Sequence, residues 1–95
     1  MNTEMQSIEI TSDVCISDVL TIYTRNSVYE FFVIDPVRAY GLVKGGALGT
    51  CAKAAFICQP TVLTAGSKAR LLIETATGQR YITTSTIKTI NRLRR

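Results

Sequence analysis

Residues 19–35, VLTIYTRNSVYEFFVID, decide the fold that this sequence predicts. They have the pattern of two strands joined by a turn over residues 24–27, TRNS. Asparagine tolerates positive φ, and a two-residue loop suits the twist of paired strands. Arginine is not an ideal first loop residue, so a longer loop remains an alternative. The stretch therefore predicts a β-hairpin.

The expected register divides the hairpin side chains between two faces, because cross-strand partners lie on the same face of a sheet. With a two-residue loop, Thr24 pairs with Ser27 and Val19 pairs with Phe32. One face then collects the more uniformly apolar side chains, Leu20, Ile22, Tyr29, Phe31 and Val33, and it is the expected core face. The other face is mixed and carries Val19, Thr21, Tyr23, Val28, Glu30 and Phe32. A slip of one residue would exchange the two roles.

The rest of the chain continues as short apolar or alternating segments separated by turn residues. We expect further strands at residues 38–44, 50–59, 68–75, 80–84 and 88–93, and residues 7–10 are a candidate edge strand. Alanines make a short helix the alternative for residues 50–59, and residues 1–7 are expected to be flexible. Five to seven short antiparallel strands, with turn signals about every 8–12 residues, indicate an all-β barrel or sandwich. The 95 residues suffice for one domain, 1–95.

The predicted order of elements resembles that of SH3-like and Sm-like small barrels, which also end in a strand, a one-turn bend and a last short strand. More locally, the segments TRNSVYEF (24–31), GG (45–46) and YITTSTIKTI (81–90) are similar to a group of small bacterial proteins of unknown role. In that group, a Thr-Arg-Asn-Ser-x-Tyr strand turn, a Gly-Gly and a terminal Thr-Ser-x-Ile/Val are spread over one small β domain. The similarity covers most of the chain from Val19 onward and implies a fold but no activity.

The residues that usually carry catalysis or bind metal are missing or scattered. The chain has no histidine, and no spacing places a base beside a serine or cysteine nucleophile. Its three cysteines, Cys15, Cys51 and Cys58, fall short of a four-cysteine zinc site, and we expect buried, reduced thiols. The glycine-rich residues 45–50, GGALGT, lack the Gly-Lys-Ser/Thr ending of a phosphate loop. We therefore predict a protein that is not an enzyme and needs neither metal nor cofactor.

The N-terminal residues, MNTEMQSIEITSD, lack the basic start and the apolar stretch of a secretory signal. No apolar run approaches the roughly 18 residues of a membrane-spanning helix. The sequence therefore predicts a cytoplasmic location and no membrane partner.

Charge is distributed unevenly along the chain. Residues 1–35 carry a net charge of −5, residues 36–67 carry +3 and residues 68–95 carry +6, which gives the total of +4. Such asymmetry can steer a charged partner or pair one copy of the chain with the next. The alternative is that strands distant in sequence neutralise each other in the fold.

Two functional hypotheses follow. The first is a non-catalytic interaction or assembly module that forms a homo-oligomer, because the hairpin and residues 50–59 carry apolar side chains on two faces. Small barrels also have open edges, which are often paired across subunits. The expected oligomer interface comprises Val19, Tyr23, Val28, Phe32 and Phe56.

The alternative hypothesis is a small barrel that binds RNA or DNA through a basic C-terminal surface. Its expected phosphate contacts are Arg80, Lys88, Arg92, Arg94 and Arg95. Tyr23, Tyr40 and Tyr81 would stack on bases if they are exposed.

Overall fold

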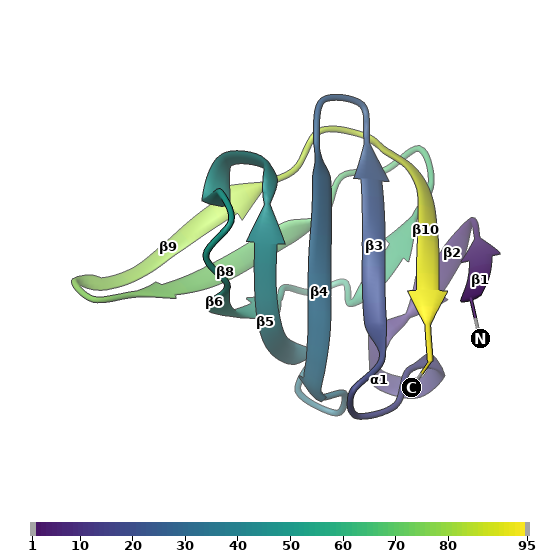
Figure 1. Ribbon diagram of the computed structural model, residues 1–95, viewed down its shortest axis with the longest axis horizontal. Helices are drawn as coiled ribbons and strands as arrows, with labels where there is room; N and C mark the ends of the chain where they lie inside the picture. Colours follow the sequence, from purple (N-terminus) through teal and green to yellow (C-terminus); the bar gives the residue numbers. More distant parts are fainter. Residues whose placement is uncertain (1, 95) are drawn as a thin grey trace.

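The computed structural model describes residues 2–94 and places most of them in antiparallel strands (Figure 1). Eight strands form one sheet in the order β1-β10-β3-β4-β5-β6-β8-β9, and β2 pairs with β7 in a second sheet. Two single helical turns, α1 and η1, interrupt the strands. The elements are β1 (Asn2–Met5), β2 (Ser7–Glu9), α1 (Ile10–Asp13), β3 (Val19–Thr24), β4 (Val28–Asp35), β5 (Tyr40–Gly45), η1 (Gly46–Leu48), β6 (Lys53–Ile57), β7 (Val62–Thr64), β8 (Arg70–Thr75), β9 (Gly78–Thr83) and β10 (Ile87–Leu93).

The central hairpin β3–β4 has the predicted register. Val19 pairs with Phe32, and Tyr23 pairs with Val28 at the other end of the hairpin. The backbone N–H of Thr24 donates to the carbonyl oxygen of Ser27 over 2.8 Å and closes the turn. The two-residue loop is therefore confirmed, and so is the division of the hairpin into two faces.

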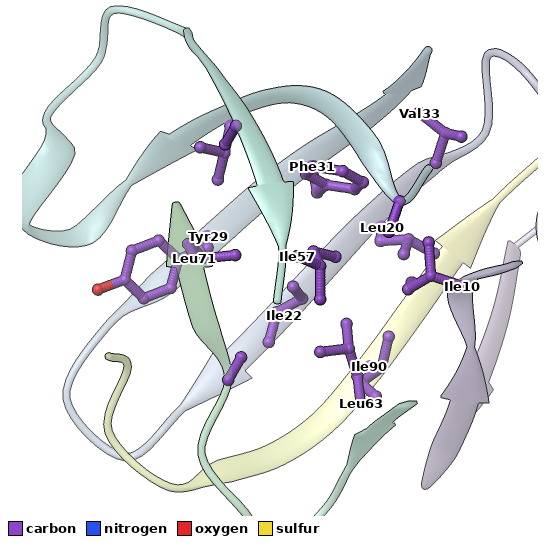
Figure 2. Packing of buried hydrophobic residues seen from close by; sticks show 14 of the residues in the cluster. Ile10, Leu20, Ile22, Tyr29, Phe31, Val33, Ile57, Leu63, Leu71 and Ile90 are labelled. Carbon is purple, nitrogen blue, oxygen red and sulfur yellow. The ribbon is translucent and has the colours of Figure 1, made fainter. Parts of the chain in front are cut away.

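The inner face of the large sheet carries the core. All five side chains of the expected core face are buried, which confirms the prediction for Leu20, Ile22, Tyr29, Phe31 and Val33. Figure 2 shows these side chains gathered with those of α1, β6, β7, β8 and β10, including Ile10, Ile57, Leu63, Leu71 and Ile90. The short segments β2 and β7 thus cover the inner face of the hairpin.

The all-β antiparallel class is confirmed, but a closed small barrel with five to seven strands is wrong. The described residues form ten strands, and the large sheet is open between β1 and β9. β2 lies within the candidate edge strand at residues 7–10, whereas β1 and β7 were not expected and have only four and three residues. Segments of this length show too few alternations to be recognised as strands in a sequence.

Two local expectations also differ from the structure or are decided by it. Residues 2–5, expected to be flexible, form β1 and pair with β10. The segment 50–59, for which a helix was the alternative, contains β6 and is a strand between β5 and β8. Its alternation continues the inner face through Ala55 and Ile57, and this burial outweighs the helix propensity of alanine.

Helix α1 is held over the inner face by Glu9. The Glu9 carboxylate accepts hydrogen bonds from the backbone N–H of Thr11 over 3.2 Å and from the Thr61 hydroxyl over 2.5 Å. The Glu9 N–H donates to the Asp13 carboxylate, and the Ile10 N–H donates to the Thr61 carbonyl oxygen over 3.1 Å. The Thr61 hydrogen bond is the main cause that lowers the pKa of Glu9, followed by the Thr11 N–H.

The surface area is that of a monomer of ordinary compactness. The chain exposes 5365 Å² to solvent, and the size scaling for monomeric proteins gives about 5,400 Å² for this mass. One copy of the chain therefore exposes about the area expected of a folded monomer of its mass.

Candidate functional site

A row of apolar side chains crosses the outer face of the large sheet. Its members are cross-strand partners on five neighbouring strands, β10, β3, β4, β5 and β6: Leu93, Val19, Phe32, Leu42 and Ala54. None of the five is buried, and Leu42 and Leu93 are 36% and 40% exposed. An apolar row thus lies uncovered on the side of the sheet that faces away from the core.

A second apolar row lies beside the first. Tyr40, Phe56, Leu72 and Tyr81 are successive partners on β5, β6, β8 and β9. Tyr40 is two residues from Leu42, and Phe56 is two residues from Ala54, so both rows lie on the same face. The Tyr40 and Phe56 rings are 4.7 Å apart between centroids. We call the nine residues of these two rows the outer apolar face.

The exposed end of the second row is partly covered by a cation. Tyr81 is 57% exposed, and the Arg70 guanidinium lies 4.2 Å from the centroid of its ring. Such a contact is worth roughly 0.5–1 kcal/mol at an exposed site. Arg70 therefore limits how much of the Tyr81 ring is free to stack on another group.

A polar pair borders the first apolar row. Glu30 on β4 and Lys44 on β5 are cross-strand partners, and their charged atoms lie 3.4 Å apart. Both side chains are about half exposed. Together with the apolar neighbours Val19, Phe32, Leu42 and Ala52 they line a shallow hollow of about 300 Å³. The face therefore combines an apolar row, a hollow and one charge of each sign.

The structure places all five residues of the expected oligomer interface on the outer side of the sheet. Val19, Phe32 and Phe56 belong to the outer apolar face, and Tyr23 pairs with Val28 closer to the hairpin turn. Both of these turn-side residues are exposed. A polar pair, Thr21 with Glu30, separates them from the apolar row.

Six members of the outer apolar face were not identified from the sequence as interface residues: Tyr40, Leu42, Ala54, Leu72, Tyr81 and Leu93. Alternation within residues 40–44 does predict that the side chains of Tyr40 and Leu42 lie on the face of the sheet that Val43 does not share. The register between β4 and β5 does not follow from the sequence, however, and only that register brings Leu42 beside Phe32.

The basic residues expected to contact nucleic acid do not form one surface. Arg80 lies on β9 at one end of the large sheet, whereas Lys88 and Arg92 lie on β10 near the other end, and Arg94 follows that strand. Arg95 lies outside the described residues.

Two of these arginines contact acidic or carbonyl groups of the chain itself. Arg92 pairs with the buried Leu20, so it faces inward, and its guanidinium donates to the Asp13 carbonyl oxygen over 3.0 Å. Arg94 lies 3.5 Å from the carboxylate of Asp18, a residue that is only 1% exposed. Both guanidinium groups therefore contact groups of the protein itself and do not form one surface with the other basic residues.

The three cysteines are not the buried thiols that the composition suggested. Cys15 and Cys51 are exposed, Cys58 is half-buried, and all three are free. They lie in connections, after α1 and on either side of β6, where the core does not reach. Within residues 2–94, no group of three cysteine or carboxylate side chains is placed to hold a metal ion. No helix in this part of the chain is long and apolar enough to cross a membrane.

No protein-family model, curated protein or solved structure matches this chain. The functional argument therefore starts from the outer apolar face itself.

Proposed function

We propose that the protein is a non-catalytic assembly module that pairs with a second copy of itself through the outer apolar face. The observation that supports this proposal is the uncovered row from Leu93 to Ala54, which crosses five strands. Two sheets can pack face to face about 10 Å apart with their side chains interdigitated.

A second copy is the occupant that best complements the charges on this face. In a two-fold pair the same patch meets itself. A two-fold axis along the strands, between β4 and β5, places Phe32 over Leu42 of the second copy. The same axis places Glu30 over Lys44 of the second copy, because the two residues are partners in one row. Each copy then supplies both a carboxylate and an ammonium group to its partner.

The size of the face indicates a reversible complex. Five strands span about 24 Å, and the residues along each strand that carry the apolar rows and the polar pair span about 20 Å. The face therefore covers about 480 Å², which is below the roughly 800 Å² per partner that stable complexes bury and in the range of weak, transient complexes. We expect a monomer–dimer equilibrium that responds to protein concentration.

The oligomeric mass tests this function directly. Sedimentation equilibrium of the wild type is expected to show a dimer at high concentration, whereas Leu42→Lys, with a charge in the apolar row, remains a monomer. Val37→Lys is the matched control, because Val37 is 77% exposed and lies in the β4–β5 turn, outside the outer apolar face. A wild type that stays monomeric at every concentration, or a Leu42→Lys variant that still dimerises, contradicts the proposal.

A charge exchange tests the orientation of the two copies. Glu30→Lys alone brings two like charges together in the proposed pair and is expected to weaken it. The double variant Glu30→Lys/Lys44→Glu restores opposite charges and is expected to recover most of the dimer. The intrachain ion pair is exposed and contributes little to folding, so both variants should fold. A double variant as weak as Glu30→Lys would contradict this axis but leave the Leu42→Lys result standing.

The nucleic-acid alternative remains a prediction without a comparable observation, because Arg80 is separated from Lys88, Arg92 and Arg94. The similarity to small bacterial β-domain proteins and the cytoplasmic location likewise stay predictions.

A further inference from the structure

The β8–β9 hairpin extends away from the body of the sheet at the end opposite to β1 (Figure 1). Between its tip and the start of β6 lies an open hollow of about 490 Å³. The residues that line the hollow are Lys53, Thr75, Thr77, Gly78, Gln79 and Arg80. Two of these six are cations and none is a carboxylate.

The strand register places the side chains of both cations, Lys53 and Arg80, on the inner side of the sheet. Lys53 is the partner of Val43, and Arg80 is the partner of Ile73. Val43 and Ile73 are buried in the core, and cross-strand partners share a face. Lys53 and Arg80 therefore continue the inner face at the point where the apolar core ends.

Neither cation forms an ion pair with another residue in the part of the chain that the structure describes. In the described residues, the three ion pairs join Arg38 to Asp35, Lys44 to Glu30 and Arg94 to Asp18, so none of them includes Lys53 or Arg80. Glu74 is the carboxylate closest in sequence, but it alternates with the inward-facing Ile73 and so points to the outer side. Two like charges that face one hollow repel each other, and a bound anion would relieve this repulsion.

We propose that this hollow binds the phosphate group of a small ligand. A phosphate carries up to two negative charges, which match the two cations, whereas a carboxylate carries only one. Arginine offers a planar set of donors that fits phosphate oxygens, and lysine adds a compact charge. Thr77 supplies a neutral donor at the rim, while the Thr75 hydroxyl donates to the Gly78 carbonyl oxygen over 2.8 Å and fixes the turn.

This site is independent of the proposed self-association. The hollow lies on the inner side of the hairpin, and the outer apolar face lies on the opposite side. Phosphate binding should therefore be unchanged in the monomeric Leu42→Lys variant, and dimerisation should be unchanged when the hollow loses its charge.

The test is a titration of the labelled full chain with inorganic phosphate, followed by amide chemical shifts in NMR spectra. We expect saturable shifts at Thr77, Gln79 and Arg80. Arg80→Gln and Lys53→Gln should each weaken binding at least about tenfold, the loss of one charge-assisted hydrogen bond. Arg70→Gln is the matched control, because Arg70 lies on the same hairpin but alternates with the inward-facing Leu71. It should bind phosphate as the wild type does.

Two further titrations identify the source of the phosphate. Adenosine monophosphate represents a free phosphate monoester, and a single-stranded oligothymidine represents a phosphodiester backbone. Tighter binding of the monoester supports a small phosphorylated ligand. Oligonucleotide binding that is lost in Lys53→Gln/Arg80→Gln supports the same site with nucleic acid as its source. Absence of saturable phosphate binding by the wild type overturns the proposal, and so does equal weakening by Arg70→Gln and Arg80→Gln.

Discussion

The inner and outer faces of the central strands both carry an apolar row, yet only the inner row is buried. Leu20, Phe31 and Val43 form one row of partners on the inner face, and each is at most 1% exposed. Val19, Phe32 and Leu42 form the neighbouring row on the outer face, and none of them is buried. The two rows have similar hydrophobicity, so hydrophobicity along these strands does not by itself decide which face is covered.

The inner face is buried and the outer face is not because the short elements β2, α1 and β7 pack on the inner side of the sheet. β2, α1 and β7 place Ile8, Ile10 and Leu63 on the inner face, and all three are buried. β2 and β7 pair with each other through Ile8 and Leu63, 55 positions apart in the sequence. No described element crosses the outer face in the same way, which leaves that face for a second copy in the function proposed above.

The largest expected effect on the free energy of unfolding comes from removing one aromatic ring, and the comparison is between a ring on the inner face and a ring on the outer face. Phe31→Ala removes a fully buried ring and should lower the free energy of unfolding by about 3–5 kcal/mol. Phe32→Ala removes the adjacent, half-buried ring and should cost clearly less stability, while it shifts the monomer–dimer equilibrium toward monomer. Urea denaturation at a concentration where both proteins are monomeric measures the first effect, and sedimentation measures the second. Equal losses of stability in Phe31→Ala and Phe32→Ala would contradict the difference in burial between the inner and the outer face.

A smaller loss is expected when the inner face is overfilled. At Gly41 a β-carbon would overlap the Phe32 carbonyl oxygen and lie 2.9 Å from the Phe31 ring. Gly41→Ala should therefore lower the free energy of unfolding by about 3 kcal/mol, at the upper end of the cost of overpacking. Ala54→Val is the control on the outer face of the adjacent strand, and it should change stability by less than about 0.5 kcal/mol. Denaturant midpoints that shift equally in both variants would contradict an open outer face.

The sequence could predict what depends on neighbours in the chain. Turn residues and two-residue alternation gave the hairpin, its register and its buried side, because all of these are local. The alternation of Ile8 and Ile10 marked β2 as a candidate strand, but its pairing with β7 could not be predicted, since β7 has three residues and lies far from β2 in the sequence. The second apolar row depends on the register of β6, β8 and β9, and the exposure of Cys15 and Cys51 depends on where the core ends.

The contact that holds the cover in place should make stability depend on pH. Glu9 and Thr61 connect α1 to the segment before β7, and their hydrogen bond is the first cause that lowers the pKa of Glu9 below its ordinary value of 4.5. A carboxyl whose pKa is lowered by folding stabilises the folded state above the unfolded-state pKa. That stabilisation is lost as the pH falls through the folded-state pKa.

Thr61→Val removes the donor and retains the shape of the side chain, so it isolates this contact. The melting temperature of the variant should lie below that of the wild type at pH 7, and the difference should shrink as the pH falls below about 4.5 and Glu9 is protonated. Thr83→Val, at an exposed position of β9, is the control for loss of a threonine hydroxyl. A difference between wild type and Thr61→Val that stays constant down to pH 3 would mean that the hydroxyl acts through packing alone. In that case the inner cover would be held by apolar contacts, and the ionised state of Glu9 would not contribute.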